Sequence, residues 1–444
     1  MPTLVTQVFL GNLRDVRLLK ICRLVCKSWN IEGSHSLRAC SKVCIKEGSS
    51  RLKNFTTLVL QKALGQLNYL PSPFQNLHVE VSTFTNPTFI EFVMKVPITS
   101  LNIFLDRVNG RQLGSFLAAN KTSLTDLEIR TFSHFGLDKY KTINSVKLTC
   151  LNRLALKDFC SSCTHIQFFE GILSRCKPGW LDLWFSNKDA LAYLLPAGNA
   201  ENLKKLQLTV SGISKKAWKH LGNLRFSRLR SLWFLANDSI HEPDDLQQWQ
   251  LFCQNASPLL EDFETNLPIS FAQELIFSNL KSIRIEDTIV WSYFTPKRFP
   301  SLVEIIFDFL GQLNIKAQNE VPHRVVSSLS IMMQGDRVDK DSLKEDLMRL
   351  LTIPRRKSIT DFLELETIKF GWEFVMNPLM LRHCLPMVPK LRQIYLYWND
   401  SLSAPLLSDT LSHLERIVIC NHAEGRFKVA MAQVAENSPN AFMG

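Results

Sequence analysis

Motifs of the common enzyme classes are missing from this sequence. It has no glycine-rich phosphate loop, no G-x-S-x-G, no H-E-x-x-H and no Rossmann fingerprint. No apolar run approaches the roughly eighteen residues that span a bilayer. The start lacks a basic segment followed by an apolar stretch, so no secretory signal is visible. We therefore expect a protein without catalytic residues, without a cofactor and without membrane contact.

The cysteines do not form a regular set. There are eleven, an odd number without repeated spacing, which argues against a disulfide framework and favours the reducing cytoplasm or nucleus. Cys22 and Cys26 are four residues apart, as are Cys40 and Cys44, so each pair falls on one face of a helix. We expect these four to be small buried hydrophobic residues.

A second cysteine group contains residue types that can bind zinc, namely Cys160, Cys163, His165 and Cys176. A single Cys-x-x-Cys without a second pair falls short of the usual structural zinc site. We expect buried or loop cysteines here and no metal.

What the sequence does contain is a six-residue pattern, apolar-x-x-apolar-x-apolar, that returns fifteen times with a mean period of about 26 residues. The clear copies start at Leu124, Leu151, Leu203, Leu280, Leu391 and Leu414. The weaker copies start at Phe55, Phe74, Ile98, Pro178, Leu229, Leu260, Leu302, Val326 and Leu365. A period of about 20 to 29 residues with an L-x-x-L-x-L core is typical of leucine-rich repeats. The pattern predicts an α/β solenoid over residues 49–444, with a curved parallel sheet and with helices or loops on its convex side.

The residues between the apolar positions of each strand point outward and form one continuous concave surface. Aromatic side chains on a rigid sheet are typical binding anchors. The candidate substrate-binding residues on this surface are Trp180, Asp182, Trp184, Trp233, Tyr395 and Tyr397. A register slip of one residue would instead place the aromatic side chains in the core.

The spacing also predicts two departures from the regular repeat. The interval from Val326 to Leu365 is longer than the others and predicts an insertion near residues 333–362, which contains the basic run Arg355-Arg356-Lys357. We expect a cap near residues 421–444.

The first fifty residues follow a different pattern. Residues 1–53 hold ten Lys or Arg against three acidic residues, which gives +7 of the total net charge of +11. Helical spacing predicts one helix ending near Gly11-Asn12, a second capped by Asp15 and running to Trp29, and a third over 34–43. The charge suits nucleic acid, an acidic protein or an ordinary solvated face, and no nucleic-acid motif accompanies it.

Within this segment Leu4-Val-Thr-Gln-Val8-Phe9, Leu13-Arg-Asp15-Val16 and Val25-Cys26-Lys27-Ser-Trp29 resemble an F-box over residues 1–48. Two features of the family pattern differ: its opening Leu-Pro has no counterpart, and Thr3 stands in place of its Glu. The resemblance implies docking to an acidic Skp-family adaptor, itself bound to a cullin. The residues that it assigns to adaptor binding are Leu4, Val8, Phe9, Leu13, Val16, Val25, Cys26 and Trp29.

Together the two patterns are similar to the F-box proteins with leucine-rich repeats. This class implies the substrate-recognition subunit of an SCF-type ubiquitin ligase, a cytoplasmic or nuclear protein whose repeats bind an unknown protein substrate. Two alternatives stay open at this point. The helical head can be a simple cap on a non-ligase scaffold, or the repeats can hold a small molecule.

Overall fold

The structure is a computed structural model of the chain. It describes residues 3–13, 15–40, 42–46, 76–81, 97–104, 110–131, 146–158, 163–237, 242–269, 275–285, 295–309, 328–333, 366–370, 390–397, 414–420 and 441–443, with isolated positions between 87 and 94. The chain divides into two compact units, Met1–Leu203 with Val210–Ala217, and Lys204–Thr209 with Trp218–Gly444. Each unit is described by itself.

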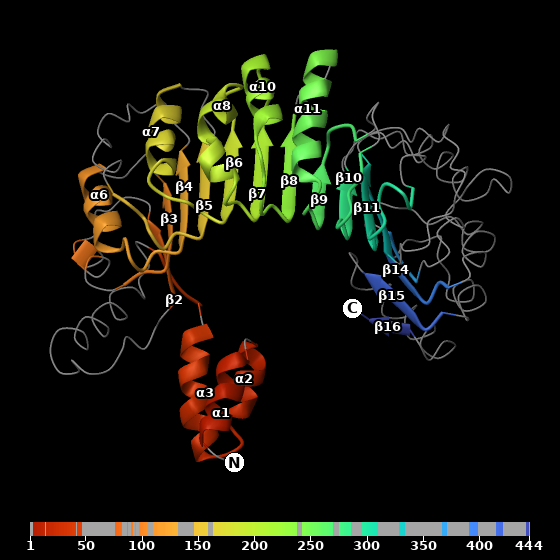
Figure 1. The fold of residues 1–444 in the computed structure, drawn as a ribbon. Helices are drawn as coiled ribbons and strands as arrows, with labels where there is room; N and C mark the ends of the chain where they lie inside the picture. The colour runs from red at the N-terminus through yellow and green to blue at the C-terminus, as the bar shows by residue number, and fades with distance from the viewer. Residues whose placement is uncertain are drawn as a thin grey trace. The chain divides into compact units, whose positions relative to one another are not determined.

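A three-helix head opens the first unit, with α1 (Thr3–Asn12), α2 (Val16–Cys22) and α3 (Lys27–Cys40) (Figure 1). The predicted end of the first helix at Gly11-Asn12 is confirmed. Asp15 caps α2 as predicted, because its carboxylate accepts hydrogen bonds from the amides of Arg17 at 2.7 Å and Leu18 at 3.2 Å.

The later helix boundaries differ from the prediction. Helix α2 ends at Cys22, not Trp29, because the amides of Leu24 and Val25 turn back to carbonyls three residues earlier. The predicted helix over 34–43 is wrong in both limits, since α3 starts at Lys27 and residues 42–46 form a strand. The sheet therefore begins inside the range assigned to the head.

Parallel strands follow the head in the first unit and pair in chain order. They are β1 (Lys42–Lys46), β2 (Asn76–Val81), β3 (Ser100–Phe104), β4 (Asp126–Thr131), β5 (Arg153–Asp158) and β6 (Trp180–Phe185). Strand β7 spans Lys205–Val210.

The second unit continues in the same way, with parallel pairing from β8 to β16 in chain order. These strands are β8 (Ser231–Ala236), β9 (Asp262–Thr265), β10 (Ser282–Ile285), β11 (Glu304–Phe309), β12 (Ser328–Met333), β13 (Thr367–Phe370), β14 (Gln393–Tyr397), β15 (Arg416–Cys420) and β16 (Ala441–Met443).

The repeat prediction is confirmed strand by strand. Each copy of the apolar pattern from Phe74 to Leu414 is followed by a strand that begins two residues after its start; the copy at Phe55 lies outside the described residues. The chain is thus an α/β, solenoid-like fold. The segment 334–362 of the predicted insertion is also outside the described residues, and β16 lies within the predicted cap.

Backbone hydrogen bonds repeat from one turn to the next. The carbonyl of Thr99 accepts from the amides of Thr125 and Asp126, and the carbonyl of Thr125 accepts in turn from Asn152 and Arg153. The same double acceptance recurs in the second unit. Each repeat therefore holds the next in a fixed register, which places outward residues of equal offset beside one another.

Helices cover the apolar side of the sheet. In the first unit they are α6 (Gly110–Ala119), α7 (Cys163–Leu173), α8 (Ala190–Leu194) and α9 (Ala197–Ala200). Phe169 of α7 contacts Phe185 of β6 edge to face, with ring centroids 5.6 Å apart. The core thus lies between helices and strands, with Leu127, Leu154 and Leu181 fully buried in it.

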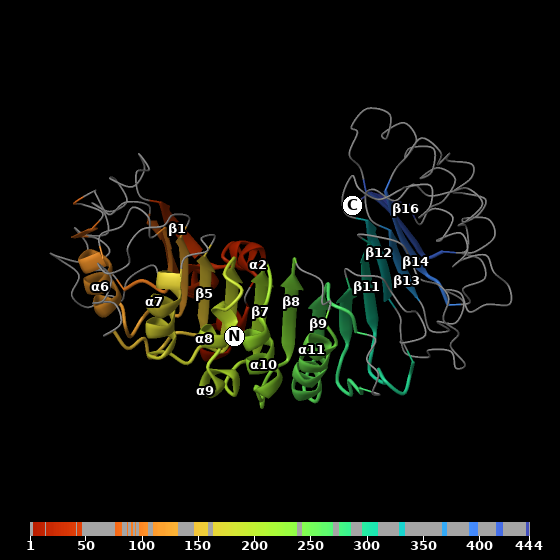
Figure 2. The same cartoon turned by 90° about the horizontal axis from the view of Figure 1, so that it is seen from above.

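Aromatic side chains fill the core of the second unit. Trp218 of α10 (Lys215–Asn223) packs on Phe234 of β8, with ring centroids 6.1 Å apart. Trp249 of α11 (Pro243–Ala256) packs on the same phenylalanine, with ring centroids 5.0 Å apart. Figure 2 shows α11 on one side of β8 and β9. In the part of the chain that the structure describes, no helix is long and apolar enough to cross a membrane.

Candidate functional site

The head exposes much of its apolar surface. Its interior is small, with Thr6, Leu10 and Leu19 buried. Eight larger apolar side chains are each at least 46% exposed, and they define the head surface: Val5, Val8, Phe9, Leu18, Ile21, Leu24, Val25 and Ile31. Exposed apolar area on a soluble protein often marks an interaction site, so exposed apolar side chains in this number make the head a candidate protein interface.

Helical spacing explains how one short helix serves both the interior and this surface. In α1, Thr6 and Leu10 are four apart and buried, while Val5, Val8 and Phe9 are three and four apart and exposed. The helix is therefore apolar on two sides, and only one side is needed to hold the head together. The other side is available to a partner.

Three of the eight residues assigned to adaptor binding belong to the head surface, namely Val8, Phe9 and Val25. Val8, Phe9, Val25 and Cys26 are exposed. Leu13 and Trp29 are half-buried, and the rings of Trp29 and Phe9 lie 5.8 Å apart. Leu4 and Val16 lie in α1 and α2, and their side chains are outside the described part of the structure.

Five members of the head surface are not among the residues that the F-box resemblance assigns to adaptor binding: Val5, Leu18, Ile21, Leu24 and Ile31. Their signal was present, since they are the apolar residues left over once a minimal core is assigned. The expectation that the paired cysteines are buried is wrong for three of the four, and the side chain of Cys40 lies outside the described part of the structure. Cys22 is half-buried, and Cys26 and Cys44 are exposed, because α2 ends before Cys26 and Cys44 lies in a strand.

Basic side chains accompany these apolar residues. Arg17 and Lys20 of α2 and Lys27 of α3 are exposed, on a segment whose net charge is +7. The head therefore combines exposed apolar side chains with exposed basic ones, which suits an acidic partner that also offers apolar contacts.

A second candidate surface is the outward face of β3–β6, on the side of the sheet opposite to the helices. Strand register arranges its residues in three rows across the strands. The first row is Ser100, Asp126, Arg153 and Trp180; the second is Asn102, Glu128, Ala155 and Asp182; the third is Phe104, Arg130, Lys157 and Trp184.

An ion-pair network occupies the centre of this face. It joins three carboxylates and three cations, namely Asp126, Glu128, Asp182, Arg130, Arg153 and Lys157. Arg153 is its hub, with guanidinium nitrogens 2.9 Å from Asp126, 3.2 Å from Glu128 and 3.4 Å from Asp182. Its guanidinium also lies over the Trp180 ring, 4.7 Å from the centroid.

Lys157 completes the network, 3.4 Å from Glu128 and 3.6 Å from Asp182. Ala155 lies between the two basic residues of β5 on the same face and is fully buried. Because Ala155 has only a methyl group, Arg153 and Lys157 have room to reach the carboxylates of both neighbouring strands. A larger residue there would force these side chains apart.

The two central carboxylates respond differently to this environment. Burial raises the pKa of Glu128, but the hydrogen bond from Arg130 and the charges of Lys157 and Arg153 outweigh it, so the net shift is downward. Burial raises the pKa of Asp182, and the charges of Lys157 and Arg153 do not cancel this effect. Glu128 is therefore the more favourably ionised of the two.

The predicted substrate-binding residues of β6 lie on this outward face, since Leu181, Leu183 and Phe185 point into the core. Trp184 is 41% exposed, but Trp180 is half-buried beneath Arg153. Asp182 is only 4% exposed, so the expectation that it is open to a partner is wrong. Arg153 and Lys157 cover its carboxylate.

The remaining predicted residues lie in the second unit. Trp233 of β8 is half-buried, beside Glu264 of β9 in the strand register. Tyr395 of β14 is half-buried with the Lys369 ammonium 5.8 Å from its ring centroid. Tyr397 ends β14, and its side chain is outside the described part. The register thus separates these residues from one another along the second unit.

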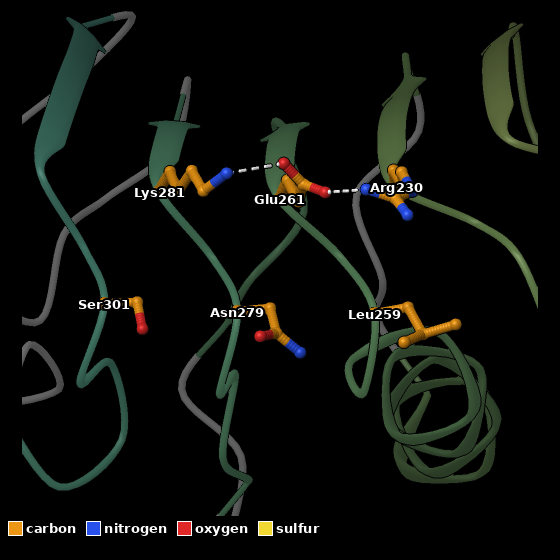
Figure 3. Close-up of a pocket in the computed structure, with 6 residues that line it drawn as sticks. All are labelled: Arg230, Leu259, Glu261, Asn279, Lys281 and Ser301. Carbon is orange, nitrogen blue, oxygen red and sulfur yellow. Dashed lines mark hydrogen bonds and ion pairs between the residues drawn. The ribbon is translucent and has the colours of Figure 1, made fainter.

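A shallow pocket of about 210 Å³ opens in the second unit, beside the turns that lead into β9 and β10 (Figure 3). It is lined by Arg230, Leu259, Glu261, Asn279, Lys281 and Ser301. Both carboxylate oxygens of Glu261 are already paired, with Arg230 at 2.5 Å and Lys281 at 2.7 Å. The hydrogen bonds from these two bases hold the pKa of Glu261 below its ordinary value. The lining keeps a net charge of +1, because one carboxylate faces two bases, and both bases already bind that carboxylate. A small, shallow pocket whose charged groups are engaged with one another gives little support to a small-molecule receptor.

The cysteines considered for zinc are not gathered by what the structure describes. Cys176 is buried, its thiol donates to the carbonyl of Ile172, and burial raises its pKa to about 12. Cys163 begins α7, and Cys160 is outside the described residues. Among the described residues no group of three or more His, Cys, Asp or Glu side chains is placed to hold a metal ion.

Comparison with known proteins identifies no family. No family model matches the chain, and no curated protein matches it. Among solved structures, one described as the complex of Rad7 and Elc1 in yeast matches 99% of this chain and 92% of that chain, at 14% sequence identity and a TM-score of 0.38. A likeness at this level supports no assignment of partner or activity.

Proposed function

We propose that this chain is the substrate-recognition subunit of a cullin-based, SCF-type ubiquitin ligase. The head docks an acidic Skp-family adaptor, and the outward face of the sheet binds the protein to be ubiquitinated. The chain itself is non-catalytic in this proposal. It acts in the cytoplasm or nucleus by proximity, because it raises the effective concentration of target lysines at the ligase.

The observation that supports the proposal best is the head surface. A free three-helix unit would lose stability by leaving eight large apolar side chains in water while burying so few. The cost is recovered if a partner covers them. The F-box resemblance falls on the same helices, and the basic charge of this segment favours an acidic partner by long-range attraction.

Binding to a purified Skp-family adaptor tests the proposal. We expect retention in a pull-down and faster association at low ionic strength. Val8→Glu and Leu24→Glu each place a charge in the apolar contact and should weaken binding about 30-fold or more. Leu259→Glu, at an exposed apolar residue of the second unit, is the matched control and should bind like the parent chain.

Absence of retention with a folded sample would remove the ligase assignment. The chain would then be a non-ligase repeat scaffold whose head serves as a cap. Equal loss of binding in the Leu259 control would show that the assay reports folding and not the head surface.

A further inference from the structure

The third row of the outward face has a composition of its own. Phe104, Arg130, Lys157 and Trp184 occupy it, one from each of β3, β4, β5 and β6. The carboxylates of the network belong to the other two rows. The third row therefore presents two adjacent cations between two aromatic rings, at the carboxyl ends of the strands.

The cations keep hydrogen-bonding capacity toward a ligand. Arg130 and Lys157 both contact one oxygen of Glu128, at 2.5 Å and 3.4 Å, and Lys157 also lies 3.6 Å from Asp182. A guanidinium has five N–H donors and an ammonium has three, so each can bind a further anion. Trp184 at one end is substantially exposed, and at the other end the Arg130 guanidinium lies 5.5 Å from the centroid of the Phe104 ring.

The spacing of the row matches an extended peptide. Neighbouring strands are about 4.8 Å apart, so Phe104 and Trp184 are about 14 Å apart across three intervals. In an extended chain, side chains on one face recur every 6.6 to 6.8 Å, roughly. Residues i and i+4 of a peptide crossing the strands therefore reach the two aromatic rings, and residue i+2 falls between Arg130 and Lys157.

We propose that this row binds an extended segment of the target with the pattern apolar-x-anionic-x-apolar, running across β3–β6. The anion is a glutamate or aspartate carboxylate or a phosphorylated side chain, and it bridges Arg130 and Lys157. The flanking apolar side chains pack on Phe104 and Trp184. This inference rests on the proposed function, because it names the class of target segment that the repeats recognise.

Fluorescence anisotropy with a labelled Gly-Leu-Ser-Glu-Ser-Leu-Gly peptide tests it, using the full chain. Replacing the glutamate by glutamine should weaken binding about tenfold or more, because a charge-assisted hydrogen bond is lost. A third peptide carries phosphoserine in that position. Whichever of the glutamate and phosphoserine peptides binds more tightly identifies the source of the anion. Equal affinity for the glutamate and glutamine peptides would overturn the proposal.

The protein variants test the aromatic end of the row. Trp184→Ala should weaken binding of the glutamate peptide about tenfold. Tyr193→Ala is the matched control, since Tyr193 is an exposed aromatic residue of the helical side with the Lys216 ammonium 4.2 Å from its ring centroid. It should change binding less than twofold. Equal effects of the two substitutions, or no binding to the folded parent, would overturn the inference.

Adaptor retention is measured on the same preparations. Peptide binding that fails beside intact retention overturns this inference alone. Retention that fails beside intact peptide binding overturns the proposed function and leaves a peptide-binding repeat protein.

Discussion

Replacing the hub of the ion-pair network gives a demanding test of the interpretation of the outward face. Arg153→Met keeps a long apolar stem and removes the guanidinium that contacts Asp126, Glu128 and Asp182. The side chain of Arg153 is 18% exposed, so its charge is only partly screened by water. The substitution leaves three carboxylates facing the two remaining cations.

The magnitude follows from burial. Breaking a fully buried ion pair by removing one partner costs about 3–5 kcal/mol, whereas an exposed pair is worth about 0–1 kcal/mol. The network lies between these limits, because Asp182 is buried but Lys157 still contacts it at 3.6 Å. We expect Arg153→Met to lower the free energy of local unfolding by about 2–3 kcal/mol.

Native-state hydrogen exchange of the β4–β6 amides measures this quantity directly. A loss of 2–3 kcal/mol corresponds to exchange faster by about 30- to 150-fold, at 1.4 kcal/mol per factor of ten. Arg392→Met is the matched control, because Arg392 is 57% exposed and has a 3.5 Å ion pair with the exposed Glu415. Its strand should exchange less than about threefold faster.

Two results would refute the reasoning. One is exchange in β4–β6 that changes no more than in the Arg392 control. The other is a double variant, Arg153→Met with Asp182→Asn, that is no more stable than Arg153→Met alone. Neutralising Asp182 should restore part of the loss, because the single variant leaves that buried carboxylate poorly compensated.

Three further predictions concern the same unit. Glu128→Gln should destabilise the chain at neutral pH, because the pKa of Glu128 is lowered in the folded state. A lowered pKa contributes stability above the ordinary pKa, and this stability is lost as pH falls through the folded-state value. Asp182→Asn should be neutral or stabilising, because the pKa of Asp182 is raised in the folded state. Urea unfolding at pH 7 and pH 4 distinguishes the two, and the same sign for both at pH 7 contradicts the assignment. Ala155→Leu should cost about 1–3 kcal/mol in the same assay by displacing the basic side chains; an unchanged midpoint argues against close packing there. Asp15→Ala should cost about 1 kcal/mol by removing the cap of α2, visible as faster amide exchange in that helix alone.

The strands could be predicted from sequence because one copy of the six-residue apolar pattern, a hexad, fixes both the position and the register of each strand. Two strands were missed for an identifiable reason. The hexad of β1 opens with Cys40 before Val43 and Ile45, and its register against Leu77 and Val79 of β2 shows that it is a true copy. The apolar residues before β1 also fit helical spacing, which predicted a helix over 34–43 and left the strand unrecognised. Strand β16 likewise has a small residue, Ala441, at the register position opposite Ile417.

In the head, the spacing of apolar residues does not predict where the second helix ends. Apolar residues continue at helical spacing from Val16 to Val25, so nothing in the pattern marks the turn after Cys22. The turn is set by tertiary packing, because α3 must return across α1 and α2. Gly33 lies at that crossing, where an added Cβ would meet the Arg23 Cγ at 2.9 Å. Such a close approach is visible only in three dimensions.

The network could have been found in part from sequence, and its limits define what a surface prediction needs. Aligning the hexads places Glu128, Ala155 and Asp182 in one row and brings Arg153 and Lys157 between them. The alignment does not reveal that these bases cover Asp182 and leave Trp184 exposed, because that depends on how long side chains fold over an alanine. A residue's outward position in a repeat is therefore a statement about the backbone. Whether the residue can meet a partner depends on the side chains of the two strands beside it. The third row has its cations between aromatic rings. For this reason it is a better candidate for target binding than the three β6 residues considered alone.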